Sequence, residues 1–142
     1  IGQGGFLEYA QIYSNFYGTP KGPVMKYLEE GKDVILEIEM QGARQVKEMY
    51  PEAVLIFVLP PSLEELRNRL TTRGTETQEQ VNERLSTSFE EIKQVKDYNY
   101  FIFNENNKTT ESAMIIENLI VAEKNKASRY EKAIIKKFEE EL

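Results

Sequence analysis

Apolar residues recur along the chain in short stretches that predict β-strands. Residues 6–13 and 34–40 alternate between apolar and polar positions, which is the pattern of a strand with one buried face. Residues 53–59 and 100–103 are continuously apolar, which is typical of core strands, and the first of these two predicts a strand buried on both faces of a parallel sheet.

Segments with helical spacing alternate with these strands. Two of them begin with capping boxes, Ser62 with Glu65 and Thr77 with Gln80, in which side chains satisfy free backbone amides. Further helices are expected at 23–30, at 41–49, and as two amphipathic helices at the C-terminal end, the last with Tyr130, Ile134, Phe138 and Leu142 on one stripe. This alternation predicts an α/β fold with a parallel sheet, although only three strands of parallel type are present.

Composition narrows the possible chemistry. The chain has 142 residues, enough for one domain with its own core, and it contains neither cysteine nor histidine. Disulfides, thiolate nucleophiles and histidine-based triads are therefore excluded, so that any reaction must use carboxylates, arginines, hydroxyls and backbone groups. The net charge of −6 disfavours nucleic acid and anionic membranes as partners. No stretch approaches a membrane span, and we expect a cytoplasmic protein.

Glu8 is the first candidate for a functional role. In a strand over residues 6–13 it shares a face with apolar residues, and an unpaired buried carboxylate is costly. Glu8 must then meet a partner or border a cleft. An edge strand with Glu8 in water is an equally good interpretation of the residues alone.

Glu37 and Glu39 form the second candidate group. They share one face of the strand expected at 34–40, near its carboxyl end, where open α/β sheets bind ligands. Two carboxylates at this spacing can hold metal-bound waters or accept hydrogen bonds from a substrate. An edge strand with a solvated face is the alternative. Because Gln41-Gly42 and a helix follow at once, we favour the functional interpretation.

Three arginines form the third group. Arg69 and Arg73 share one helix face, Gly74-Thr75 follows, and Arg84 lies early on the next helix. Two helices joined by such a turn suit a moving lid that carries positive charge, and guanidinium groups bind phosphate in pairs of hydrogen bonds. Surface arginines paired with nearby glutamates are the ordinary alternative for each of them.

Four segments together resemble the guanylate kinase family: FLEYAQIYSNFYGT, GKDVILEIEMQGARQV, FVLPPSLEELRNRLTTRGTET and FIFNEN. They occur in the family's order between residue 6 and about residue 106. The resemblance implies a P-loop nucleoside monophosphate kinase fold, in which helices flank a parallel sheet. It also implies a partial GMP-binding subdomain at 1–32 and a core domain at 33–142, with a lid at about 66–90.

The implied reaction transfers the terminal phosphoryl group of MgATP to GMP, giving GDP and ADP. By resemblance, Arg73 and Arg84 are catalytic lid residues, and Glu37 lies near the magnesium and the reacting phosphates. No residue is expected to ligate the metal directly. The remaining site positions bind the two nucleotides: Glu8, Tyr17, Gly18, Thr19 and Glu39 for GMP, and Arg69 and Asn104 for ATP.

The family's N-terminal strand, its GxxxxGK[ST] loop and the following phosphate-clamping segment have no counterpart in the sequence. We therefore expect the N-terminal phosphate-loop unit to be absent and the 142 residues to be inactive alone. A noncatalytic guanylate-kinase-like module that binds a phosphorylated peptide is the alternative. A kinase for another nucleoside monophosphate is a third possibility, against which Glu8 and Thr19 speak.

Overall fold

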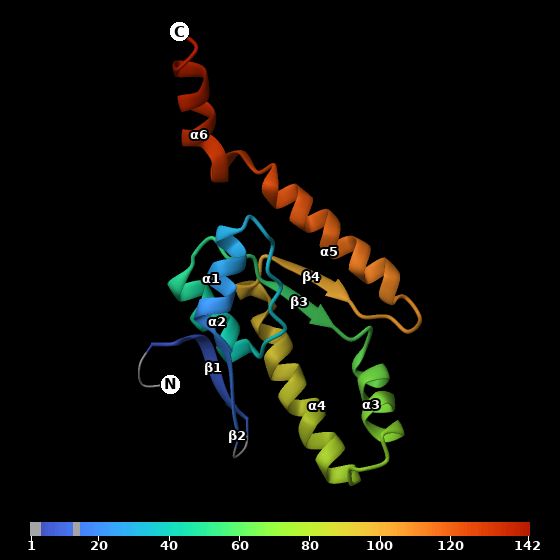
Figure 1. The fold of residues 1–142 in the computed structure, drawn as a ribbon. Helices are drawn as coiled ribbons and strands as arrows, with labels where there is room; N and C mark the ends of the chain where they lie inside the picture. Colours follow the sequence, from blue (N-terminus) through green and yellow to red (C-terminus); the bar gives the residue numbers. More distant parts are fainter. Residues whose placement is uncertain (1–3, 13–14) are drawn as a thin grey trace. The chain divides into compact units, whose positions relative to one another are not determined.

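The structure is a computed structural model that describes residues 4–12 and 15–142. The chain forms two compact units, Ile1–Leu55 and Ile56–Leu142 (Figure 1). This division follows packing. The functional division expected at residues 32/33, with a lid at about 66–90, stays a prediction.

The first unit contains a β-hairpin and two helices. Strand β1 (Phe6–Ile12) pairs antiparallel with β2 (Asn15–Pro20), and helices α1 (Lys21–Glu29) and α2 (Met40–Met49) follow. Both helices confirm the expected segments to within two residues. Residue 13, the expected end of the first strand, lies outside the described residues.

A register shift between Phe6 and Glu8 changes which residues of β1 face inward. Pro20 pairs with Phe6 and Thr19 pairs with Glu8, so β1 has one residue more than β2 at this point. Leu7 and Glu8 are consequently both buried, whereas Phe6 is 37% exposed. The strict alternation that placed Phe6 on the same face as Glu8 is therefore wrong at Phe6.

Residues 33–39 form no regular strand, so the strand expected at 34–40 is wrong as an element of secondary structure. A β-strand is defined by backbone hydrogen bonds to an adjacent strand. Within the described part of the chain, no strand pairs with this segment. The predicted division of this segment into a buried side and an exposed side is nevertheless correct. Val34, Leu36 and Ile38 pack against a core of Leu7, Val24 and Val46, whereas Glu37 and Glu39 are exposed.

The second unit is built on a parallel pair of strands, β3 (Ile56–Leu59) and β4 (Tyr100–Phe103). Between them lie α3 (Leu63–Thr72), α4 (Gln78–Ile92) and the 3₁₀ helix η1 (Lys93–Asp97), and after them α5 (Thr109–Lys124) and α6 (Ala127–Glu139). The parallel pair and its flanking helices confirm the α/β class. The strand expected at 53–59 begins only at Ile56.

The expectation that residues 53–59 are buried on both faces of the sheet is wrong. Val58 is 53% exposed, and on β4 Phe101 is 55% exposed although its neighbour Ile102 is only 5% exposed. Helix α5 contacts β4, but β3 and β4 pair only with each other in the described part of this unit, and several of their apolar side chains stay exposed. The apolar composition of the strands therefore exceeds what this sheet buries.

Helices α3 and α4 pack on each other as a pair, joined by a turn at Gly74 (Figure 1). Ser62 caps α3 by accepting a hydrogen bond from the Glu65 amide, and Thr77 and Gln80 form the complete capping box of α4. Leu66, Leu70, Val81 and Leu85 form the core between the two helices. Within the described ranges, no helix has both the length and the apolar character that a membrane crossing requires.

Candidate functional site

Glu8 lies in the interior of the first unit. It is 5% exposed, and its Oε1 accepts a hydrogen bond of 2.6 Å from the hydroxyl of Thr19, its register partner on β2. The interpretation of Glu8 as a solvated residue of an edge strand is therefore wrong. A carboxylate accepts up to four hydrogen bonds, so this arrangement leaves Glu8 capacity for donors from a ligand.

The other residues expected at the GMP site lie on the same unit. Tyr17 and Gly18 precede Thr19 on β2, and Tyr17 is 57% exposed. At Gly18 a side chain would be too close to its neighbours, because a Cβ atom would lie 2.8 Å from a ring carbon of Phe6 and 2.9 Å from the Glu8 carbonyl oxygen. Glu39 is the N-cap residue of α2, with extended backbone angles.

Glu37 and Glu39 meet some of the requirements of a site for Mg²⁺ bound to phosphate. Glu37 and Glu39 are exposed on one side of the segment before α2. The described residues contain no group of three carboxylates that could enclose a metal ion by themselves. Magnesium is commonly held by one or two carboxylates together with substrate phosphates and water, so two exposed glutamates fit an ion that arrives with a nucleotide.

In the second unit, the structure joins Arg69 to Asn104. Arg69 Nη2 donates to the Asn104 carbonyl oxygen at 2.7 Å and to Asn106 Oδ1 at 3.0 Å. Because β3 and β4 are parallel, the start of α3 and the loop after β4 meet at the carboxyl end of the sheet. Arg69 and Asn104, the two residues expected on the ATP side, therefore lie together although they are 35 residues apart in the sequence.

Glu65 completes this polar cluster and was not singled out from the sequence as more than a cap residue. Its Oε1 accepts from Asn106 Nδ2 at 2.7 Å and from Arg69 Nε at 3.2 Å. The hydrogen bond from Asn106, with the bond and charge of Arg69, holds the pKa of Glu65 below its ordinary value. The spacing of Glu65 and Arg69 along α3 is the one sequence signal that could have indicated their pairing.

The two expected lid arginines differ in their surroundings. Arg73 is exposed at the C-cap of α3. Arg84 Nη1 lies 2.8 Å from Glu76 Oε1 and is 44% exposed. The ordinary alternative, a surface arginine paired with a glutamate, thus describes Arg84 in this conformation. A partly exposed pair of this kind is weak, so Arg84 stays available to a more strongly charged partner.

Glu123 is a second buried carboxylate, and its burial was not predicted from the sequence. It is 8% exposed and accepts hydrogen bonds from the Tyr100 hydroxyl at 2.6 Å and from Arg129 Nε at 2.7 Å. These two bonds hold the pKa of Glu123 below its ordinary value, and the bond to Glu123 raises the pKa of Tyr100. Each bond is fully internal to the second unit, so we assign this network to the attachment of α5 and α6.

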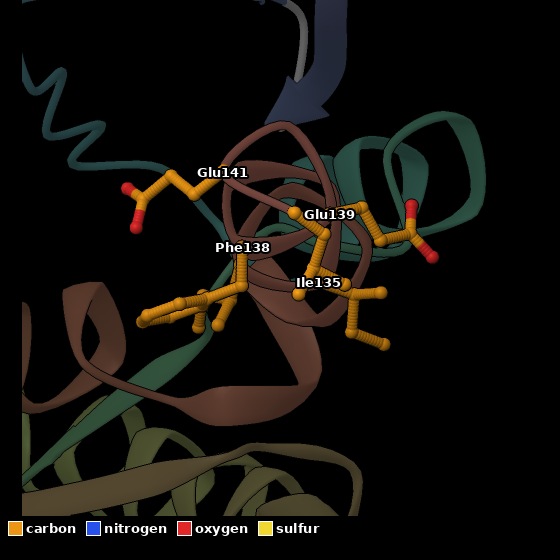
Figure 2. Close-up of a pocket in the computed structure, with 6 residues that line it drawn as sticks. Ile135, Phe138, Glu139 and Glu141 are labelled. Carbon is orange, nitrogen blue, oxygen red and sulfur yellow. The ribbon is translucent and has the colours of Figure 1, made fainter.

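Two hollows in the described surface are lined by residues of the C-terminal part of the chain, none of which is an expected site residue. One lies at the end of α6, where Phe138 and Ile135 point to the same side of the helix while Glu139 and Glu141 point away from it (Figure 2). The expected apolar stripe of α6 is exposed, with Phe138 61% accessible. This hollow is open and carries none of the polar groups that the sequence predicts for the nucleotide sites.

The comparisons with known proteins decide the family. A family model described as guanylate kinase matches residues 1–123. The guanylate kinase of Clostridioides difficile is 64% identical over 142 residues, which are 100% of this chain and 68% of that protein. The chain belongs to the guanylate kinase family. The guanylate kinase of Clostridium tetani is 48% identical over 135 residues, 95% of this chain and 64% of its own length.

A solved structure supports the same assignment. The crystal structure of guanylate kinase from Anaplasma phagocytophilum matches with a TM-score of 0.70 and 35% identity, covering 88% of this chain and 59% of that one. The fold is therefore that of a guanylate kinase, as expected from the sequence. This chain spans only about two thirds of the length of such relatives.

Proposed function

We propose that the protein containing this chain is a guanylate kinase that transfers the terminal phosphoryl group of ATP to GMP, giving GDP and ADP. One observation carries the proposal: in a chain of this family, Glu8 is buried and hydrogen-bonded to Thr19. Burying a carboxylate costs free energy, and a base that donates hydrogen bonds to it would offset that cost.

Guanine has the donors that Glu8 needs. Its N1–H and its exocyclic N2 amine lie side by side, so one carboxylate can accept from both. Adenine carries a lone pair at N1, which a carboxylate repels. A buried polar site that is matched in this way rejects the wrong base by orders of magnitude. In this proposal Thr19 and Glu39 border the base. The hydroxyl of Tyr17, an exposed residue, donates to the GMP phosphate, and Gly18 allows close approach.

The arginines and acids supply the remaining roles. Arg73 and Arg84 would stabilise the charge on the transferring phosphoryl group when α3 and α4 close over it. Arg69 and Asn104 would face the ATP base. Glu37, with Glu39 nearby, would orient waters on Mg²⁺ bound to ATP, an ion that neutralises phosphate charge. Holding both nucleotides in line and excluding water is then the main task of the protein.

The noncatalytic phosphopeptide module is the less favoured function. Such a module needs a phosphate site but neither lid arginines nor acids near a metal. This chain has Arg73, Arg84, Glu37 and Glu39. That full set supports the enzyme, in which each of these residues has a task.

Kinetics of the full gene product test the proposal. We expect phosphorylation of GMP to exceed that of AMP by orders of magnitude in kcat/KM, and Glu8→Gln to raise KM for GMP far more than KM for ATP. Equal rates with GMP and AMP would overturn the assignment of the base. An unchanged affinity of Glu8→Gln for GMP would place Glu8 outside the pocket. A protein that binds phosphopeptides and phosphorylates no nucleotide would establish the module instead.

A further inference from the structure

The carboxylate of Glu8 is packed against Gly42 of α2. A Cβ atom added at Gly42 would lie 2.9 Å from Cδ of Glu8 and 3.3 Å from its Cγ, and it would overlap Oε2. Helix α2 contacts β1, and Ala43 and Gly42 are both buried at this contact. The space that the Glu8 carboxylate occupies is thus the space that a side chain at position 42 would take.

Local backbone geometry does not account for a glycine at this position. Gly42 lies within α2, between Met40 and Met49, and is not among the glycines with positive φ. Glycine weakens a helix interior relative to alanine, so the local preference opposes it. Contact with Glu8 is the feature of the described structure that requires the missing Cβ.

We propose that Gly42 is a positioning residue that sets the place of the Glu8 carboxylate and thereby the specificity for guanine. The inference rests on the proposed function, because it deepens the role assigned to Glu8. Oε1 of Glu8 accepts the hydrogen bond from the Thr19 hydroxyl, and the missing Cβ at Gly42 leaves room for Oε2. Both carboxylate oxygens can then face the two donors of guanine together.

A Cβ atom at position 42 would clash with the end of the flexible Glu8 side chain. The position of this clash determines which property Gly42→Ala should change. Glu8 can rotate away from a new Cβ at little conformational cost, so Gly42→Ala is expected to fold. Its carboxylate would then lie away from the guanine donors. The loss should therefore appear in recognition of the base and not in affinity for ATP.

The test compares Gly42→Ala with Gly22→Ala in the full gene product. Gly22 lies in α1, and a Cβ there would meet no atom within 4 Å, so the control adds the same methyl group to a helix without a clash. GMP and IMP are the acceptor substrates. IMP lacks the exocyclic amine, so the ratio of kcat/KM for GMP to that for IMP measures how well the carboxylate meets both donors.

For Gly42→Ala we expect KM for GMP to rise about tenfold or more, the value of lost hydrogen bonds to a charged group. The preference for GMP over IMP should fall by a similar factor, while KM for ATP and all values for Gly22→Ala stay within about twofold of wild type. Unchanged GMP kinetics would overturn the proposal, as would an equal loss for GMP and IMP. Failure of the proposed function would look different, because wild type would then show no preference for GMP over AMP.

A second background keeps the proposal testable if Gly42→Ala does not fold. Glu8→Asp shortens the acid by one methylene and withdraws it from α2. In that background Gly42→Ala should fold and should cost several-fold less in kcat/KM for GMP than it does beside Glu8, which is the coupling expected of two residues in contact. Additive losses, or failure to fold in both backgrounds, would show that the cause lies elsewhere in α2.

Discussion

The side chain of Arg69 donates a hydrogen bond to the backbone carbonyl of Asn104, 35 residues further along the chain, at a distance of 2.7 Å. Asn106 links the same guanidinium to Glu65. The first turns of α3 are therefore tied to the loop between β4 and α5. In the proposed enzyme this tie would keep the ATP-side loop in place while the far ends of α3 and α4 move.

Glu65→Gln should loosen the loop at residues 104–108. The substitution removes the charge that attracts Arg69. It also weakens the two hydrogen bonds that Oε1 accepts from Arg69 and Asn106, because an uncharged amide oxygen is a weaker acceptor than a carboxylate oxygen. We expect faster amide hydrogen exchange across 104–108, measured by mass spectrometry. Glu64→Gln is the matched control, because Glu64 shares the first turn of α3 but is exposed. Equal exchange in the two variants would show that Glu65 does not hold the loop.

Stability should depend on pH through Glu123. The hydrogen bonds from Tyr100 and Arg129 lower its pKa in the folded state. Its stabilising contribution is therefore complete above the ordinary pKa of about 4.5 and is lost as the pH falls through the lower folded value. At pH 7, Glu123→Gln should reduce the free energy of unfolding of this unit by about 1.5–3 kcal/mol, typical of hydrogen bonds to a charged group.

Urea unfolding of wild type and Glu123→Gln between pH 7 and pH 3 measures this dependence. The difference between the two proteins should shrink as the pH falls below about 4.5. Glu117→Gln is the control, since Glu117 lies on the same helix but is exposed. A difference that stays constant down to pH 3 would contradict the role of the ionised carboxylate.

Local signals in the sequence predicted the elements that depend on local interactions. Both capping boxes, at Ser62 and at Thr77, form as expected, because a cap joins residues three positions apart. The strand at 34–40 was wrong for the opposite reason: the alternation of Val34 and Glu37 records which side is buried, but a strand also needs a partner elsewhere in the chain.

The candidate site shows the same limit. A pattern of period two placed Glu8 on a face with apolar residues but left open whether that face is buried. The bulge at Leu7 and the contact with Gly42 are tertiary features. Asn106 and Glu123 carry no spacing that marks them, since their partners lie in other elements. The expected site residues came from the family resemblance. The structure adds the contacts that hold some of them in place, such as those of Glu8 and Arg69.

Arg73 and Arg84, the arginines proposed for a lid, should affect catalysis without affecting stability. Arg84→Ala removes a partly exposed pair with Glu76, and such pairs contribute about 0–1 kcal/mol. Arg73 is exposed, so its removal should cost no more. In the full gene product we expect either substitution to lower kcat about 10³-fold, as for arginines that stabilise a transferring phosphoryl group.

Arg67→Ala separates this role from a general need for arginine on the lid. Arg67 also lies on α3 and joins it to α4 through a hydrogen bond of 2.9 Å to Asn82. Its removal therefore weakens the helix pair without touching the proposed phosphoryl site, and kcat should stay within about twofold of wild type. Parallel thermal unfolding of the three variants checks that their folds are intact. Equal losses of kcat in all three would mean that the lid acts through its packing, because a direct role at the phosphoryl group requires Arg73 and Arg84 alone to be sensitive.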